Sequence, residues 1–173
     1  MYMGTAVLIS YSRLTGERQH LLEAGHQLVR TAGHLSGGSG GSGGRGRLLQ
    51  HGYSHYTGHL SCCRWARGNG WAVLAITDFL TAATELDILS EDISQAVLGL
   101  FRSLVGELLT VQSQGGLWHN ILDNNQTFLE TSSSAMFLAG LIRGHRHGWL
   151  LEESGLLRER IETAWRGLSS RSG

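Results

Sequence analysis

Apolar residues recur along this chain at spacings of three and four, which is the period of an α-helix. The pattern predicts six helices, over residues 2–14, 17–33, 69–86, 90–112, 132–146 and 152–168. The fourth shows it most clearly, because its apolar side chains share one face; they are Ile93, Val97, Leu100, Phe101, Leu104 and Leu108. We therefore expect an all-α fold.

The predicted helices are of two kinds. The second and fourth carry one apolar stripe on an otherwise polar surface, which is typical of a helix with one face in water. The first, third and fifth contain "GTAVLISY", "GWAVLAITDFL" and "SAMFLAGLI", which are apolar nearly all round. Such helices are expected to be buried on all sides. The chain therefore alternates inner and outer helices.

A weak internal repeat accompanies this alternation. The tripeptides Ala6-Val7-Leu8, Ala72-Val73-Leu74 and Ala135-Met136-Phe137 recur at intervals of 66 and 63 residues. The loop "LLQHGYS" (48–54) also aligns with "LWHNILD" (117–123), which sets Ser54 opposite Asp123.

Repeated pairs of outer and inner helices predict an α/α toroid, and the three hairpins of this chain do not close a ring of six. The long loops would line one mouth of the barrel at the N-termini of the inner helices. Helix N-termini carry partial positive charge and favour carboxylates. A plain helical bundle is the alternative. Three hairpins would leave apolar edge helices exposed, through which the chain could associate with itself or with a partner.

Composition narrows the choice of partner and compartment. The 14 basic and 14 acidic residues balance, which argues against a nucleic-acid partner. No run of about 18 apolar residues is present, so we expect no membrane span. The N-terminus lacks a basic region and a cleavage site, so we expect no signal peptide. Cys62 and Cys63 form no disulfide framework, so they do not identify the redox compartment. Location in the cytoplasm and secretion as part of a longer precursor therefore both stay open.

We expect one domain over residues 1–168, with a flexible Gly/Ser-rich insertion at 36–46 and a short tail at 169–173. The run "SGGSGGSGG" is not a phosphate-binding loop, because no Gly-Lys-Ser/Thr follows it. The sequence predicts no cofactor.

The motif "WARGNGW" (65–71) combines side chains that suit an acidic sugar. Arg67 carries a planar guanidinium that matches a carboxylate. Trp65 and Trp71 offer flat apolar faces of the kind that stack on sugar rings. The alternative is that both tryptophans lie in the core and that Arg67 pairs with an internal acid.

The motif "HGYS" (51–54) adds possible proton-transfer groups. His51 could donate or shuttle a proton. His51, His55 and His59 are four residues apart, but Gly52 and Gly58 argue against a helix here, so we predict no metal site. A Ser54 nucleophile would need a partner base, and no Gly-x-Ser-x-Gly elbow is present.

The second long loop has a similar make-up. Trp118 and His119 parallel the first loop, and Asp123 is either a structural acid or a substrate contact. Thr131 or Ser132 is the expected N-cap of the fifth helix, because a hydroxyl oxygen can accept a free backbone N–H there.

Together, "HGYS…WARGNGW" and "GGLWHNILD…FLETSSSAMFLAGLIRGHRHGWL" resemble the unsaturated rhamnogalacturonyl hydrolases of glycoside hydrolase family 105. The unsaturated glucuronyl hydrolases of family 88 are similar but more distant. The match covers nearly all of residues 1–168, so the chain resembles a truncated member. The resemblance implies an (α/α)6-barrel hydrolase that removes a 4,5-unsaturated uronic acid from pectin-derived rhamnogalacturonan oligosaccharides. In that family an aspartic acid protonates C4 of the vinyl ether, water adds at C5, and the hemiketal opens.

Carried over, the resemblance implies an acidic oligosaccharide as ligand, with Arg67 on the uronate carboxylate, Trp71 against the ring and His51 beside the acid. The full expected substrate-binding set is Arg67, Trp71, Trp65, Tyr53, Trp118 and His119. The family's acid falls on Ser54, and a serine hydroxyl is no acid near neutral pH; losing a general acid typically lowers the rate by about 10²–10⁴-fold. A non-catalytic carbohydrate-binding remnant and a helical interaction module are the alternatives.

Overall fold

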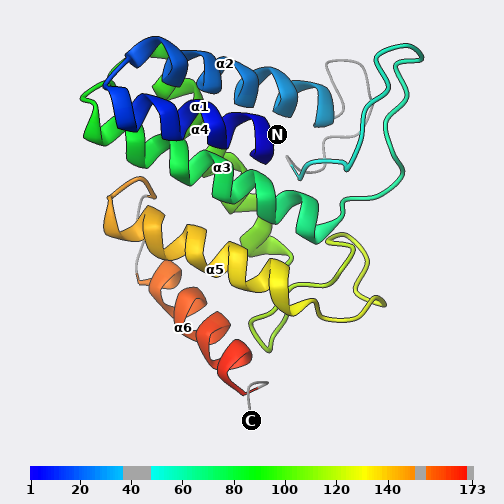
Figure 1. The fold of residues 1–173 in the computed structure, drawn as a ribbon. Helices are drawn as coiled ribbons and strands as arrows, with labels where there is room; N and C mark the ends of the chain where they lie inside the picture. Colours follow the sequence, from blue (N-terminus) through cyan, green and yellow to red (C-terminus); the bar gives the residue numbers. More distant parts are fainter. Residues whose placement is uncertain (37–47, 151–154, 171–173) are drawn as a thin grey trace.

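The computed structural model describes residues 1–36, 48–150 and 155–170, and these residues form six α-helices (Figure 1). The helices are α1 (Tyr2–Thr15), α2 (Arg18–Leu35), α3 (Ala66–Glu85), α4 (Asp92–Thr110), α5 (Thr131–Arg146) and α6 (Leu156–Ser169). The predicted all-α fold is confirmed, and α3 begins three residues earlier than the sequence pattern suggested. The predicted insertion, apart from Ser36, and the predicted helix start at residue 152 lie outside the described residues.

The helices form an inner row and an outer row. The inner helices α1, α3 and α5 lie side by side, with their N-termini at the same end of the molecule (Figure 1). The outer helices α2, α4 and α6 pack against them, and α3 contacts both inner neighbours as well as α2 and α4. The predicted alternation is therefore confirmed. We call the end at which the inner helices begin the mouth; the loops before α3 and α5 both lie there.

The prediction that every inner helix is buried on all sides is wrong for α1. On its outward face, Met3, Val7 and Leu14 are 80%, 69% and 84% exposed. In contrast, α3 buries residues on most of its surface, including Ile76, Phe79 and Leu80. The difference arises because α3 has an inner helix on each side, whereas α1 has one on a single side within the described structure.

The contact between α3 and α5 is close because α5 carries a glycine where the helices meet. A Cβ atom at Gly140 would lie 2.2 Å from Cγ1 of Val73, far inside normal contact distance. An ion pair between Asp78 Oδ1 and Arg143 Nη1, 2.5 Å apart, also joins these two helices. The close contact at Gly140 and the Asp78–Arg143 ion pair thus set the spacing between α3 and α5.

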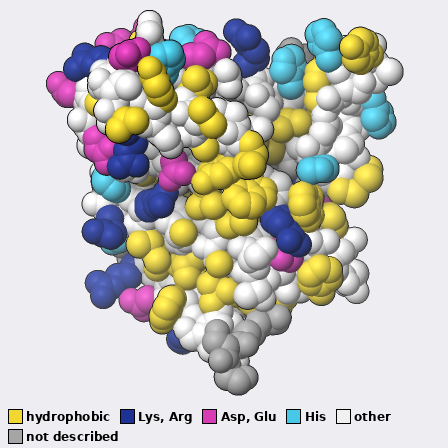
Figure 2. All heavy atoms as spheres, viewed as in Figure 1, with side chains coloured by type: hydrophobic (Ala, Val, Ile, Leu, Met, Phe, Trp, Pro, Cys, Tyr) yellow, Lys and Arg dark blue, Asp and Glu magenta, His cyan; other side chains and the backbone are white. Residues whose placement is uncertain are grey.

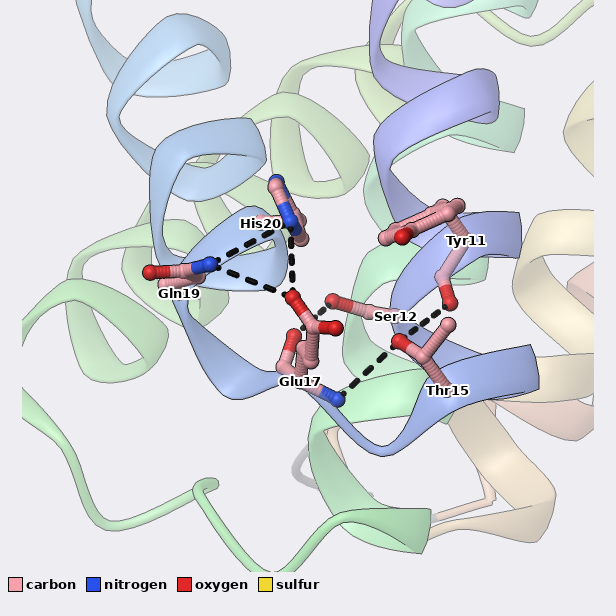
Figure 3. A network of polar contacts seen from close by, with 6 residues as sticks. All are labelled: Tyr11, Ser12, Thr15, Glu17, Gln19 and His20. Atoms are coloured by element: carbon pink, nitrogen blue, oxygen red, sulfur yellow. Dashed lines mark hydrogen bonds and ion pairs between the residues drawn. The ribbon is translucent and has the colours of Figure 1, made fainter.

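At the end opposite the mouth, a tight turn reverses the chain between α1 and α2 (Figure 3). Gly16 takes the left-handed conformation (φ 76°) that ends α1, a backbone geometry that favours glycine. The Ser12 hydroxyl donates to the Glu17 carbonyl at 2.6 Å, and Glu17 N–H donates to the Thr15 hydroxyl oxygen at 3.2 Å. These bonds satisfy polar groups in the turn and fix the first helical hairpin.

One described helix, α4, is long and apolar enough to cross a membrane on length and composition alone. Core helices of soluble proteins pass the same test. Here α4 packs against α2 and α3 and buries Val97, Phe101, Leu104 and Leu108 on its inward face, which accounts for its apolar character.

We predict that Gly140→Ala destabilises the fold by about 1–3 kcal/mol, because the added methyl group overpacks the contact with Val73. Gly99→Ala in α4 is the matched control: nothing lies within 4 Å of its Cβ position, so it should stabilise by about 0.5–1 kcal/mol through helix propensity. Denaturant unfolding followed by circular dichroism measures both. Equal effects of the two substitutions would contradict the close packing of α3 on α5.

Candidate functional site

The two long loops meet at the mouth and form its rim. Trp65 in the first loop and Ile121 in the second form an antiparallel bridge. Ala66 N–H donates to the Asn120 carbonyl at 2.9 Å, and the Trp65 indole N–H lies 3.3 Å from the Asn120 side-chain oxygen. Buried backbone groups need such partners. The loops are therefore held in one arrangement relative to each other and to α3.

Asn69, in the first turn of α3, ties the start of the first loop to this helix. Its Oδ1 accepts a hydrogen bond from Leu49 N–H, and its Nδ2 donates to the Leu49 carbonyl, both at 2.8 Å. Asn69 is only 1% exposed, and a buried amide that is satisfied on both sides strongly constrains its surroundings. Gln50 and His51, which follow Leu49 in the sequence, are thereby placed beside α3.

A cavity of about 400 Å³ opens next to these residues, between the N-terminal turn of α1 and the start of α3. Three of the predicted site residues, His51, Trp65 and Trp71, lie together in its wall. The His51 ring stands edge-on to Trp65 with centroids 4.8 Å apart, and Trp71 lies 4.9 Å from the Tyr2 ring. The complete wall is Met1, Tyr2, Met3, Leu35, Leu49, Gln50, His51, Trp65, Gly68, Trp71 and Ala72. Its size and aromatic faces suit one sugar ring.

Arg67 adjoins this cavity through Trp65 and Gly68. Its guanidinium carbon lies over the Trp65 ring, 5.4 Å from the centroid. Its Nη2 lies 3.5 Å from Oε1 of Glu130, and its side chain is 43% exposed. Charge-assisted hydrogen bonds are usually about 2.7–2.9 Å long, so this pair is loose. The guanidinium thus retains capacity to bind a ligand carboxylate.

Glu130 caps α5 and faces Arg67. Its carboxylate accepts hydrogen bonds from Ser133 N–H and from the Ser132 hydroxyl. Burial alone raises the pKa of this carboxyl, but the hydrogen bonds from Ser133 and Ser132 and the charge of Arg67 outweigh it, so its pKa lies below the ordinary value. Glu130 therefore acts as an acceptor and not as a proton donor. The N-cap of α5 is Glu130, so the prediction that Thr131 or Ser132 occupies this position is wrong by one or two residues.

Tyr53 and Ser54 lie apart from the cavity wall. Tyr53 stacks on His34 at the end of α2, with ring centroids 4.8 Å apart. Ser54 begins a tight turn: its carbonyl accepts Gly58 N–H at 2.8 Å, and its hydroxyl oxygen lies 3.4 Å from Thr57 N–H. Neither residue lines the cavity. Among the described residues that do, none carries a carboxylate side chain.

The second loop contributes structure more than ligand-binding surface. Trp118 has no exposed surface, and its indole N–H donates to the Leu108 carbonyl at 2.7 Å. The prediction that Trp118 contacts a ligand therefore does not hold in this structure. His119 bonds through Nδ1 to the Thr127 carbonyl at 2.5 Å and lines a separate polar cleft. Asp123 pairs with Arg64 at 2.6 Å, which makes it a structural acid here.

Groups that commonly bind metals are dispersed. In the part of the chain that the structure describes, no three His, Cys, Asp or Glu side chains are grouped so that they could hold a metal ion. Cys62 and Cys63 are free, and their sulfur atoms face each other at 2.8 Å.

Sequence reasoning missed Asn69, Gln50 and Tyr2. Asn69 was noticed only as part of a motif, although a polar residue in the first turn of an apolar helix signals a buried hydrogen-bonding role. Tyr2 and Gln50 carried no such signal, because they reach the cavity only once α1 and the first loop have packed against α3.

Comparison with known proteins finds relatives over most of this chain. The family model described as Glycosyl Hydrolase Family 88 matches residues 1–172. Protein Atu3128 of Agrobacterium fabrum is 31% identical over 163 residues, which cover 87% of this chain and 64% of that protein. The unsaturated rhamnogalacturonyl hydrolase YesR of Bacillus subtilis is 34% identical over 84 residues, 49% of this chain and 23% of YesR.

A solved structure shows the same fold. The family 105 glycoside hydrolase of C. acetobutylicum ATCC 824 superposes with a TM-score of 0.81 at 26% identity, over 98% of this chain and 47% of that one. Such neighbours are six-hairpin toroids. The chain therefore corresponds to part of a toroid, and it spans about half of the solved relative.

We predict that the stability of the wild-type protein decreases as the pH falls from about 5 toward the lowered pKa of Glu130. The folded state favours the carboxylate, so protonation favours unfolding. In Glu130→Gln this component of the acid sensitivity should be absent, and stability at neutral pH should fall by about 1 kcal/mol. Denaturant unfolding across this pH range measures both effects.

Glu91→Gln is the matched control, since Glu91 occupies the N-cap of α4 without making a side-chain capping bond. Its substitution should leave the pH profile unchanged. An unaltered profile in Glu130→Gln would contradict the capping role.

Proposed function

Because the chain belongs to Glycosyl Hydrolase Family 88, we propose that it binds the terminal 4,5-unsaturated uronic acid of a pectin-derived oligosaccharide, as a hydrolase of the unsaturated rhamnogalacturonyl type. YesR, which is similar to this chain over about half of its length, is named as an unsaturated rhamnogalacturonyl hydrolase. An acidic oligosaccharide is the partner that best fits the mouth.

The placement of Arg67 is the observation that carries the proposal. A fixed cation lies beside a cavity of about 400 Å³ whose wall presents Trp65 and Trp71. A uronic acid offers the complementary features, a carboxylate on a ring with an apolar face. The carboxylate would take the exposed side of the Arg67 guanidinium, and the ring would lie between the tryptophan faces.

Hydrolysis by this family's route requires an acid that protonates C4 before water adds at C5. Among the residues at the cavity wall, His51 carries a side chain suited to proton transfer. Glu130 stays ionised and bound to Arg67, Ser132 and Ser133, and Ser54 carries no acidic proton. We therefore propose slow turnover, below that of relatives with an acid at the Ser54 position by about 10²–10⁴-fold.

One observation favours a second candidate, a non-catalytic carbohydrate-binding protein. Ser54 lies in a turn outside the cavity wall, and no carboxylate lines the wall within the described residues. Such a protein would keep the arginine and tryptophan contacts and bind the same sugar without converting it.

We predict that Arg67→Gln weakens binding of an unsaturated galacturonyl-rhamnose disaccharide by about 10–100-fold, the range expected for losing hydrogen bonds to a charged group. Isothermal titration calorimetry measures the affinity. Arg64→Gln is the matched control on the same loop, because Arg64 pairs with Asp123 away from the cavity and should keep near wild-type affinity. Equal losses in both variants would exclude a specific role for Arg67.

We predict that Ser54→Asp raises the turnover of the same disaccharide, followed by loss of the vinyl-ether absorbance, by up to about 100-fold. The Ser54 hydroxyl faces Thr57 N–H outside the cavity wall, so the gain requires that the aspartate leaves this N–H and turns toward the cavity. Ser54→Asn has the same shape without an acidic proton and should show no gain. Binding without any gain in Ser54→Asp would support the non-catalytic candidate.

A further inference from the structure

Cys62 and Cys63 are adjacent in the first loop, and their sulfur atoms face each other at 2.8 Å. Successive side chains of an extended chain point to opposite sides, but the chain bends at Cys62, and both thiols lie on the same side. The Cys62 side chain is exposed and the Cys63 side chain is half-buried. The fold therefore presents two accessible thiols in near contact.

Hydrogen bonds on both sides of the thiol pair hold this bend in place. Ser61 N–H donates to the Gly52 carbonyl at 2.9 Å, and Gly52 N–H donates to the Ser61 hydroxyl oxygen at 3.0 Å. On the other side, His51 N–H donates to the Cys63 carbonyl at 3.3 Å. The pair is thus fixed by partners within its own loop, and its geometry does not depend on either end of the chain.

The distance between the sulfur atoms distinguishes two reactions of a thiol pair. A tetrahedral zinc ion would hold two sulfur atoms roughly 3.8 Å apart, whereas a disulfide bond holds them at about 2.05 Å. Histidine side chains gather around the first loop at the mouth (Figure 2). Among the described residues, however, no three His, Cys, Asp or Glu side chains are grouped to hold a metal ion. The geometry therefore favours oxidation over metal binding.

We propose that Cys62 and Cys63 form a redox-active pair, which a small disulfide of the glutathione type closes reversibly to a disulfide between adjacent residues. The proposal rests on the geometry of the first loop and does not depend on the proposed function. Its failure is read from the number of free thiols, whereas failure of the proposed function is read from sugar binding.

The reaction is a thiol–disulfide exchange in two steps. The exposed Cys62 thiol loses its proton, and the thiolate attacks one sulfur of the small disulfide, which forms a mixed disulfide and expels one small thiolate. Cys63 then loses its proton and attacks the Cys62 sulfur, which forms the Cys62–Cys63 bond and expels the second small thiolate. The two cysteine sulfurs are oxidised, and the small disulfide is reduced to two thiols that take up the two protons.

The environment of Cys63 suits it to the second step. The hydrogen bond with Cys62, together with burial and the charges of Cys62 and Asp123, raises the pKa of the Cys63 thiol. A thiol with a raised pKa forms little thiolate, and the thiolate is the nucleophile. Cys62 is therefore the expected first attacker, and Cys63 reacts once an electrophilic sulfur lies beside it.

The closed pair should be easy to reduce. Adjacent Cα atoms lie about 3.8 Å apart, which is below the range of about 4.4–6.8 Å that disulfides usually span. This deviation strains the bond and makes it more reducible, and strained or exposed disulfides are the labile ones. We expect the equilibrium with glutathione to favour reduction by roughly 100-fold more than for an unstrained structural disulfide.

Closing the bond also acts on the cavity through the backbone. The disulfide encloses the Cα atoms of both cysteines in a small ring, so the Cys63 carbonyl moves when the bond forms. This carbonyl accepts the His51 N–H, and His51 lies in the cavity wall. Oxidation should therefore weaken the contact that holds His51 in place.

The test incubates the folded 173-residue chain with excess glutathione disulfide and measures its intact mass without reduction. We expect the loss of both thiols and of two hydrogen atoms, with no glutathione retained. The chain has two cysteines, so this product identifies the Cys62–Cys63 bond. Cys63→Ser is the matched control and should stop at the mixed disulfide, with one glutathione attached. Reduced glutathione should then restore both thiols of the wild type.

The same reaction in urea tests whether the fold prepares the pair. Unfolding removes the bend, so closure should slow by about 10–100-fold because the thiols are no longer oriented. Hydrogen exchange of the folded protein measures the effect on the cavity, and the His51 amide should exchange about 10-fold faster after oxidation. A wild type that keeps both thiols, disulfides formed between chains instead of within one, or equal rates of closure in urea would each overturn the proposal. An unchanged His51 amide would overturn its link to the cavity.

Discussion

The mouth of this protein depends on the hydrogen bonds between Asn69 and the backbone of Leu49. A loop that leaves an outer helix and returns to an inner one must satisfy its buried N–H and C=O groups without regular secondary structure. One side-chain amide does so here by imitating a neighbouring strand. The second loop is anchored in a similar way, since the backbone N–H of Trp118 donates to the Ser134 hydroxyl oxygen at 3.0 Å. Leu49 and Trp118 are matched positions of the sequence repeat, so the repeat preserves an anchoring scheme as well as a helix pattern.

This anchoring explains how structural side chains and the proposed ligand-binding side chains share one short motif. Arg67 and Trp71 are four residues apart, so they lie on the same face of α3. Asn69 lies between them in sequence and points instead toward the first loop. The motif is therefore rich in polar and aromatic residues because two faces of one helix turn serve different purposes. Gly68 has a separate role in packing. A Cβ atom at this position would lie 3.4 Å from both His51 and Trp65.

Periodicity and repeat identified the six helices of the described residues and their inner and outer rows, because both follow from local apolar patterns. The burial of particular residues could not be predicted from these patterns, because it depends on neighbours that are distant in sequence. Trp65 and Trp118 both precede an inner helix in sequence, yet Trp65 borders the cavity and Trp118 is buried against the Leu108 carbonyl. The exposed face of α1 has the same origin, since an all-apolar helix is buried only where helices surround it. The capping role of Glu130 was missed because hydroxyl side chains next to it are the commoner caps.

The loose ion pair between Arg67 and Glu130 links the stability of α5 to the proposed recognition of a carboxylate. Glu130 does not depend on Arg67 alone, because Ser132 and Ser133 also donate to its carboxylate. Arg67 in turn rests on the Trp65 ring, which holds the guanidinium near the cavity without consuming its hydrogen-bond donors. A ligand carboxylate can therefore bind Arg67 while Glu130 keeps its cap on α5. The proposed binding of an acidic sugar to Arg67 therefore does not require that the helix cap be broken.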